Sequence, residues 1–364
     1  MSQPRSCNYD LHGRLTTRMT ARRASALTWP LLTSKFRYFR CPDSWPAAID
    51  FHLGPFRPAP PRDAVTVDKK FRCAPNYLCY MGGSGHRGAV ELQGFDDDQW
   101  TLRCHAPRGR WGSRVAGMLE AIQHVWAPTI AYRLQRDHGA HVVHGAAVTK
   151  HGMAIVLVGG NGTHKTPLAL DLCHRHGFQF LADDWLILAD GCAWPTVEHP
   201  SVLAGRYQSV VRGGPSHISP WALTSYLRHE GQMWRDLPAI GSGCPITMMV
   251  HLQRSNQAQS TTWGPIQANL VWQHAQALER LELIKHQNRF RTVVHFARLA
   301  MAYEYALPGS SLFQMTLGRR PTLPDWLQVP CFQSIQSSTY QPETADLVAQ
   351  AVQQASRGRL RAAA

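Results

Sequence analysis

The segment between residues 144 and 184 constrains this chain most, because it joins a strand pattern to a helix pattern through a run of glycines. Residues 153–158 are apolar and rich in β-branched side chains, which is typical of a buried strand. Gly-Gly-Asn-Gly-Thr-His-Lys-Thr follows at 159–166, and residues 167–176 have the pattern of a helix that stops at Gly177. Strand, glycine loop and helix in this order predict a phosphate-binding loop.

The chemistry of such a loop explains which residues it needs. Glycines let backbone N–H groups converge on an anion, a helix N-terminus adds its dipole, and a lysine adds a full positive charge. The residues expected to bind phosphates are therefore Gly159, Gly160, Asn161, Gly162, Thr163, His164, Lys165 and Thr166. Thr166 is also placed to bind Mg²⁺.

Two positions depart from the pattern G-x-x-x-x-G-K-[ST]. His164 stands where the pattern has glycine, and a positive φ there would cost about 1–2 kcal/mol, whereas a helical φ would be tolerated. Pro167 disfavours a helical conformation at Thr166, although proline is common in the first turn of helices. A glycine-rich turn without function is the structural alternative.

Two acidic residues, Asp183 and Asp184, follow a predicted strand at residues 178–182. If this strand runs parallel to residues 153–158, both carboxyl ends lie at the same sheet edge. One aspartate could then hold Mg²⁺ while the other accepts a proton from a hydroxyl nucleophile. A turn with a solvated aspartate is the alternative. His144 could contact a phosphate or orient an aspartate, or it could be structural.

The net charge of +14 is concentrated at one end. Residues 1–40 hold eight Lys and Arg against Asp10, which gives +7, half of the total. We therefore predict a basic, disordered leader over residues 1–47. The Arg-rich, nearly acid-free composition is also typical of a transit peptide, and translation from Met19 is a further interpretation.

Composition is that of a globular protein of 364 residues. No apolar run reaches the ~18–20 residues that span a bilayer, so we expect no membrane partner. The nine cysteines are odd in number and never spaced C-x-x-C, which favours reduced thiols and a cytoplasmic location.

Regular structure is expected after a proline-rich stretch at residues 41–66 that looks like a linker or an irregular entry. Short strands predict a small antiparallel β unit, at 77–81, 89–92 and 100–104. Residues 82–88 have glycines but no lysine, which indicates a tight turn rather than a second phosphate loop. Three aspartates at 96–98 are consecutive, so a solvated turn accounts for them better than a metal site.

The rest of the chain alternates helix and strand patterns. A helix is predicted from residue 113 and is kinked or divided at Pro128, and residues 141–148 form a hairpin with residues 153–158. Further strands are predicted at 185–188, 246–252 and 312–317, and further helices at 221–229, 266–283, 291–305 and 344–355.

Four elements in this order resemble a known family: His144-Gly145, Gly159-x-x-Gly162-x-x-Lys165-Thr166, His176-Gly177-Phe178 and Leu181-Ala182-Asp183-Asp184. Together they resemble the catalytic core of HPr kinase/phosphorylase and its relatives, which are similar to phosphoenolpyruvate carboxykinase. The close resemblance covers residues 141–190. It implies an α/β fold with a PEP-carboxykinase-like P-loop core and a mixed sheet, preceded here by the small antiparallel β unit and a helix.

The resemblance also implies ATP and Mg²⁺ as cofactors and a serine hydroxyl as phosphoryl acceptor. Asp183 would be the base, His144 would support it, Lys165 would complete the catalytic set, and Thr166 with Asp184 would hold the metal. An E-x-R-G-x-G segment of the family is missing, since the nearest stretch, 209–214, has no glutamate. The resemblance therefore does not extend to phosphorylase activity or to HPr as substrate. The divergent kinases that modify ribosomally made peptides, such as lasso-peptide precursors, look closer.

We thus expect a leader at 1–47, a β unit at 48–110, an HPr-kinase-like nucleotide-binding domain at 111–320 and a C-terminal helix and tail at 321–364. The expected function is that of an ATP-dependent serine kinase acting on a peptide or protein. Alternatives are a catalytically impaired nucleotide-binding module and a nucleic-acid-binding protein that uses the basic arm, although no nucleic-acid-binding motif accompanies it. The sequence does not determine the acceptor, the nucleotide preference or the oligomeric state, for which a homo-oligomer is one option.

Overall fold

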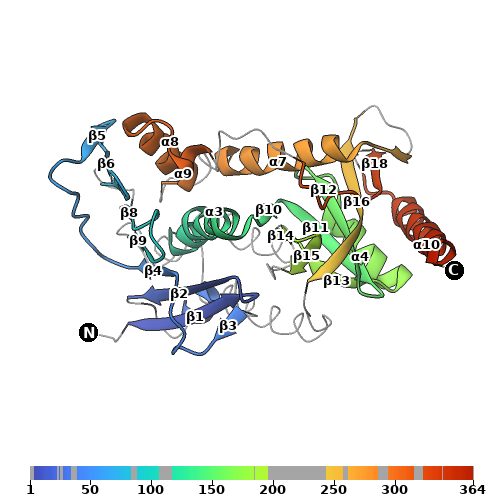
Figure 1. Ribbon diagram of the computed structural model, residues 1–364, viewed down its shortest axis with the longest axis horizontal. Coiled ribbons are helices and arrows are strands. Elements are labelled where there is room, and N and C mark those ends of the chain that lie inside the picture. The colour runs from blue at the N-terminus through green and yellow to red at the C-terminus, as the bar shows by residue number, and fades with distance from the viewer. Residues whose placement is uncertain are drawn as a thin grey trace. The chain divides into compact units, whose positions relative to one another are not determined.

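The computed structural model is a mixed α/β protein with two mixed sheets. The residues that the structure describes are 4–22, 24, 28–33, 39–82, 88–105, 117–183, 185–195, 243–256, 261–285, 294–314, 323–337 and 339–363. They belong to two compact units (Figure 1). The first takes its described residues from Met1–Gly139 and Arg280–Arg320, and the second from Ala140–Leu203, Met233–Glu279 and Pro321–Ala364.

This division differs from the expected domains. The described residues near both ends of the region 111–320 belong to the first unit, whereas those between them belong to the second. The C-terminal residues 321–364, expected to be a separate helix and tail, belong to the second unit instead. Contacts between segments far apart in sequence decide this, and patterns along the chain do not reveal them.

A nine-stranded sheet forms the first unit, with its described strands in the order β3-β1-β2-β4-β9-β8-β7-β6-β5. Their bounds are β1 Arg5–Leu11, β2 Leu15–Ala21, β3 Arg40–Cys41, β4 Ile49–Leu53, β5 Val65–Val67, β6 Phe71–Ala74, β7 Tyr77–Tyr80, β8 Val90–Gln93 and β9 Trp100–Cys104, and α1 is Thr28–Leu32. The three predicted strands correspond to β7, β8 and β9. These three strands pair antiparallel, as predicted, but they belong to a larger mixed sheet, because β4 lies parallel to both β2 and β9. Strand β4 also lies within the stretch predicted to be a linker.

The prediction of a disordered leader is also wrong. Strands β1 and β2 form a hairpin, and every second side chain of β2 is buried, including that of Met19. Arg18 lies on the other face, where its Nε–H donates to Asn8 Oδ1 at 3.0 Å and its Nη1 lies 3.6 Å from Asp50 Oδ1. Alternation of apolar side chains governs this segment in spite of its charge, so this part of the leader is a sheet rather than an arm.

The helix predicted around Pro128 is continuous in the described residues. Residues 117–121 are α-helical, a π-helical turn follows at Ile122–Trp126, and α3 continues over Ala127–His138. Proline lacks an N–H and its ring crowds the carbonyl four residues earlier, so a wider turn before Pro128 accommodates it without a break. The Thr129 hydroxyl donates to the Val125 carbonyl at 2.7 Å in this turn.

Trp126 packs this helix onto the first sheet. Its ring stacks on Phe51 with centroids 5.0 Å apart, and it meets Tyr9 edge-on at 5.6 Å. Its indole N–H donates to the Thr17 hydroxyl at 3.1 Å. The buried core of the first unit thus lies between the helix and one face of β1, β2 and β4.

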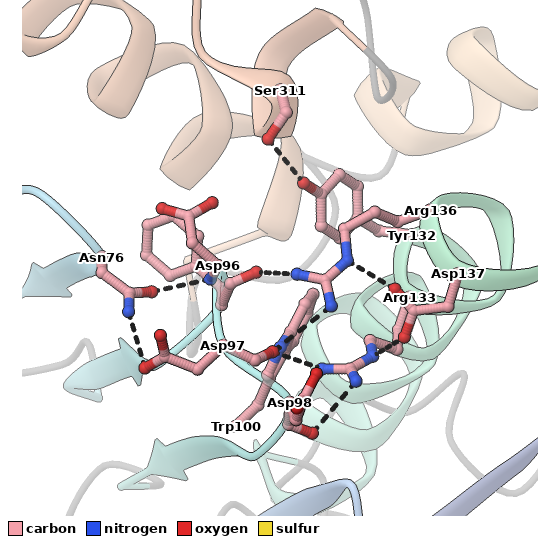
Figure 2. Close-up of polar contacts among 11 residues, drawn as sticks. Asn76, Asp96, Asp97, Asp98, Trp100, Tyr132, Arg133, Arg136, Asp137 and Ser311 are labelled. Atoms are coloured by element: carbon pink, nitrogen blue, oxygen red, sulfur yellow. Dashed lines mark hydrogen bonds and ion pairs between the residues drawn. The ribbon is translucent and has the colours of Figure 1, made fainter.

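The three consecutive aspartates form an exposed turn held by arginines of α3 (Figure 2). Arg133 donates to the carbonyl oxygens of Asp97 and Asp98 at 2.9 and 3.0 Å. Asn76 donates to the Asp97 carboxylate at 2.7 Å and accepts the N–H of Asp96 at 2.7 Å. The expected solvated turn is confirmed. Within the described ranges, no group of three or more His, Cys, Asp and Glu could hold a metal ion.

The prediction of a strand at 312–317 is wrong for its first residues, 312 and 313, which are helical. Ser311–Phe313 is a short helix, α9, after α8 at Phe296–Ala306; residues 315–317 lie outside the described residues. Ser310 accepts the Phe313 N–H at 3.3 Å, and Glu304 accepts the Gly309 N–H at 2.8 Å. These caps favour a helix start over an extended chain.

The second unit has its own nine-stranded sheet. Its described strands follow the order β10-β14-β15-β16-β12-β11-β13, with β18 beside β16 and β17 beside β18. Their bounds are β10 His141–Val143, β11 Gly145–Lys150, β12 Met153–Gly159, β13 Gln179–Ala182, β14 Leu186–Ala189, β15 Cys192–Pro195, β16 Cys244–Arg254, β17 Thr262–Pro265 and β18 Cys331–Gln336. Strand β16 is parallel to both β12 and β18.

Helices cover both faces of this sheet (Figure 1). α7, Ala268–Lys285, packs Val271 and Trp272 on one face. α4, Lys165–His176, and α10, Glu343–Ala363, share the other face, where an ion pair of 2.8 Å joins Arg175 to Asp346. The predicted helices at 266–283, 291–305 and 344–355 correspond to α7, α8 and α10, whereas the one at 221–229 lies outside the described residues. None of the helices described reaches the length and apolar character that crossing a membrane needs.

Candidate phosphate-binding site

Three segments of the second unit end at one edge of its sheet. Strands β12 and β13 are both antiparallel to β11, so they run parallel to each other on either side of it. The register pairs Gly145 with Val158 and Ala147 with Ala182. The glycine loop after β12, Asp183 after β13 and His144 before β11 therefore lie at the same edge. The expected parallel arrangement of the two strands is confirmed.

Gly159 lets the end of β12 approach its neighbour closely. A Cβ atom on Gly159 would lie 2.5 Å from the Leu252 carbonyl oxygen on β16, and 2.5 Å from the Thr163 hydroxyl oxygen. Contacts this short require the backbone to shift. The first glycine of the loop is thus needed for space rather than for an unusual φ.

The loop closes as a turn in front of α4. Thr163 donates its backbone N–H to the Gly160 carbonyl at 3.3 Å and its hydroxyl to the same oxygen at 2.8 Å. Gly162 has a φ of +79°, and His164 has φ 66° and ψ 24°. His164 therefore takes the left-handed conformation for which the pattern has glycine, at a cost of about 1–2 kcal/mol.

The His164 side chain makes a contact that glycine could not make. Its ring lies beside that of Tyr340, with centroids 6.0 Å apart, and the Tyr340 hydroxyl donates to Asp171 on α4 at 2.8 Å. Burial first, and then this hydrogen bond, raise the pKa of Tyr340 above its usual range, so the phenol stays a neutral donor. The loop is thereby connected to the segment that precedes α10.

Pro167 fits the first turn of α4, which begins two residues earlier than predicted. Proline at the third helical position lacks an N–H that would have no partner within the helix. Thr166 keeps its helical conformation, and the first helical bond runs from the Leu168 N–H to the His164 carbonyl at 3.0 Å. The helix ends with Gly177 at φ 66°, as the sequence predicts.

Lys165 is buried, with 5% of its surface exposed, and its ammonium group faces the loop. It donates to the carbonyl oxygens of Gly159 and Gly160 at 2.7 and 3.1 Å. Its third neighbour is His144 Nε2 at 3.1 Å. The charge is thus held by dipoles of the loop itself, in a place where a phosphate oxygen could replace them.

Thr166 and Asp183 form a close pair of polar side chains at this edge. The Thr166 hydroxyl lies 2.9 Å from Asp183 Oδ1 and 2.8 Å from Oδ2, and the Asp183 side chain is fully buried. One hydroxyl proton can serve only one of these oxygens at a time. The carboxylate therefore orients the hydroxyl group of Thr166. Asp184 lies outside the described residues.

His144 joins the loop rather than standing apart from it. Its Nε2 lies 3.1 Å from Asn161 Oδ1 and 3.1 Å from Lys165 Nζ. The nitrogen can donate to the amide oxygen or accept from the ammonium group, but one tautomer cannot do both. The tautomer of His144 thus decides whether Nε2 donates to Asn161 or accepts from Lys165.

Arg254 is a residue of this edge that sequence reasoning missed. It is the last residue of β16, and its Nη1 would lie 3.7 Å from a Cβ atom on Gly162. The only sequence signal was an arginine at the end of an apolar strand. Strand β18, which extends the sheet beside Arg254, was also missed because its glutamines and serine hide the strand pattern.

The oxygen atoms of the site suit the implied magnesium ion. Mg²⁺ prefers hard oxygen ligands from one or two protein groups and keeps several waters. A hydroxyl held by a buried carboxylate, as Thr166 is held by Asp183, is such a donor. The residues present therefore fit the metal that the sequence analysis implied.

The comparisons with known proteins give no independent identity. No protein-family model matches the chain, and no curated protein matches it either.

Proposed function

We propose that this protein is an ATP-dependent kinase with an HPr-kinase-related, PEP-carboxykinase-like P-loop core, which phosphorylates a serine hydroxyl of a peptide or protein. The observation that carries the proposal is the meeting of Lys165, Thr166 and Asp183 at one sheet edge. The order of these residues in the sequence could arise by chance. Their arrangement supports phosphoryl transfer more strongly, because it places a lysine in the loop beside a threonine that is hydrogen-bonded to a buried aspartate.

Phosphates would bind by exchanging partners with the loop. The ammonium group of Lys165 would leave the carbonyl oxygens of Gly159 and Gly160 for phosphate oxygens, and the N-terminus of α4 would add its dipole. His144 can accept a hydrogen bond from Lys165 in one tautomer or donate one to Asn161 in the other, so it helps to orient one of these two side chains at a time. These residues would hold the nucleotide without a large rearrangement of the sheet.

Transfer then requires one bond to form and one to break. The acceptor serine oxygen bonds to the γ-phosphorus while the bond from that phosphorus to the β,γ-bridging oxygen breaks, which gives ADP and a phosphoserine. The serine proton passes to a carboxylate oxygen of Asp183.

Magnesium would be held by Thr166 and by Asp184, as the sequence analysis assigns. Bound there, the ion would neutralise charge on the phosphate oxygens. The Thr166 hydroxyl, which donates to Asp183, would supply its oxygen to the ion. The acceptor would be a peptide or protein other than HPr, since the chain lacks the E-x-R-G-x-G segment.

Two measurements test the proposal. Mass spectrometry detects phosphoryl transfer from ATP to a panel of serine peptides, and calorimetry measures the binding of MgATP. We expect Asp183→Asn to lower transfer by about 10²–10⁴-fold with binding retained. Lys165→Ala should weaken nucleotide binding at least about tenfold. Lys150→Ala is the matched control, because this lysine of the same unit donates to the His176 carbonyl at 2.6 Å instead. Its variant should bind and transfer normally.

The outcomes separate the alternatives. Tight nucleotide binding by the unmodified chain without transfer to any peptide would identify a nucleotide-binding module instead of a kinase. Equal loss of binding in the Lys150 and Lys165 variants would mean that the loop is a structural turn. Salt-sensitive nucleic-acid binding with no affinity for nucleotides would favour the third alternative.

A further inference from the structure

Arg254 lies where a second cation could reach a phosphate in the loop. Strand β16 runs parallel to β12, and the register pairs Leu252 with Gly159, the residue at which the loop begins. Arg254 follows two residues later, at the same edge as the loop and Asp183. Residues at the carboxyl ends of neighbouring parallel strands face a common ligand position.

The guanidinium group lies against the middle of the loop. Its Nη1 is 3.7 Å from the position of a Cβ on Gly162, an exposed residue with φ +79°. Glycine leaves no side chain between the arginine and the loop backbone. The arginine therefore reaches the part of the loop that faces solvent, whereas Lys165 lies buried on its inner side.

Arg254 differs in its partners from three other arginines of the chain. Arg103, Arg133 and Arg175 each form an ion pair with a carboxylate. Within the described part of the chain, the side chain of Arg254 forms no hydrogen bond or ion pair, and the residue is exposed. A guanidinium group with five donors in a planar fork suits two oxygens of one phosphoryl group.

We propose that Arg254 is a catalytic arginine that contacts the γ-phosphoryl group as it is transferred. This inference rests on the proposed kinase function and adds the residue that stabilises its transition state. As the bond to the β,γ-bridging oxygen breaks, negative charge spreads over the γ-phosphoryl and bridging oxygens. Arg254 donates hydrogen bonds to this charge and exchanges no proton, so the atoms and electrons of the transfer stay as described above.

The test compares Arg254→Ala and Arg254→Lys with the unmodified chain. Arg254→Ala should lower kcat by about 10³-fold or more, because an arginine supplied to a phosphoryl group has effects of that size. It should weaken binding of a non-hydrolysable ATP analogue while ADP binding changes less than about twofold, since ADP lacks the γ-phosphate. Arg254→Lys keeps the charge but not the fork, so it should recover only part of the rate.

Rescue of the transfer rate by free guanidinium ion distinguishes a catalytic role of Arg254 from a structural one. Added guanidinium should restore part of the transfer rate in Arg254→Ala and leave the rate of Gln253→Ala unchanged. Gln253 is the matched control, because it is the neighbouring residue of the same strand and its side chain bonds to Gln333 at 2.8 Å. Hydrogen exchange of β12 and β16 should be the same in all three variants.

The results distinguish this inference from the function on which it rests. If the unmodified chain transfers phosphate and Arg254→Ala does so at the same rate, the inference is wrong and the kinase proposal stands. Equal weakening of ADP and ATP-analogue binding would also overturn it, because it would place Arg254 on the loop and away from the γ-phosphate. If the unmodified chain binds nucleotides but transfers none, the kinase proposal fails, and the ADP comparison still decides whether Arg254 meets the γ-phosphate.

Discussion

Replacing Gly159 by alanine tests whether the loop depends on the close approach of two strands. The added Cβ would lie 2.5 Å from the Leu252 carbonyl oxygen, whereas ordinary van der Waals contact begins at 3.4 Å. The gap must therefore widen by about 0.9 Å, the difference between these two values. A shift of this kind in a packed sheet destabilises it by about 1–3 kcal/mol.

The same shift should disturb binding, because the Gly159 carbonyl is a partner of Lys165. A displacement of about 1 Å in a binding constellation can change rates by about 10²-fold. Gly160→Ala is the matched control: its Cβ would meet Leu278 Cδ2 at 3.5 Å, an ordinary contact. We expect Gly160→Ala to lower the free energy of unfolding by less than about 0.5 kcal/mol.

Hydrogen exchange followed by mass spectrometry, with peptides that cover β12 and β16, localises the effect to the second unit. Calorimetry with MgATP measures the affinity of the two variants. Gly159→Ala should exchange faster in both strands and bind more weakly, while the hydrogen exchange of Gly160→Ala should match that of the unmodified chain. Equal exchange in the two variants would refute the reasoning, since it would mean that the strands separate without a measurable change in free energy.

Two further predictions concern histidines of the second unit. His164→Gly should raise the free energy of unfolding by up to about 1 kcal/mol in urea titrations, whereas His164→Val should lower it by about 1–2 kcal/mol, because a β-branched residue resists a positive φ. A stable valine variant would contradict the left-handed assignment. Burial, and then His274, lower the pKa of His251 to about 4. Because the unfolded side chain takes up its proton near pH 6.5 and the folded one only near pH 4, stability should fall between these values by roughly 3 kcal/mol as pH drops. His251→Met should remove that dependence, and identical pH profiles for the two proteins would refute the assignment.

The site could be anticipated where each residue follows a local pattern. The β-branched run, the glycines and Gly177 predict β12, the loop and the end of α4, and the structure has all three. The strand before Asp183 was also predicted, so its place at the edge followed once its direction was known. Arg254 could not be anticipated, because it reaches Gly162 from a strand 92 residues further along the chain (254 minus 162).

The amino-terminal region shows the opposite outcome. Charge suggested a disordered arm, yet Leu15, Thr17, Met19 and Ala21 alternate on one face and are buried. Burial of a regular apolar face outweighs the repulsion of arginines that remain on the solvated face. The alternation of these side chains with a period of two is visible in the sequence and indicates a strand. The net charge of the segment favours disorder instead, so a prediction based on charge overlooks this pattern.

The sequence by itself determined the strand, glycine loop and helix, because each depends on the propensities and spacing of neighbouring residues. Only the tertiary structure decided that His164 takes a positive φ, that Thr166 bonds to Asp183, and that β18 extends the sheet. These depend on pairing between distant segments, where backbone hydrogen bonds and side-chain packing fix the geometry. Local patterns therefore specified the parts of the candidate site, and the sheet brought those parts together.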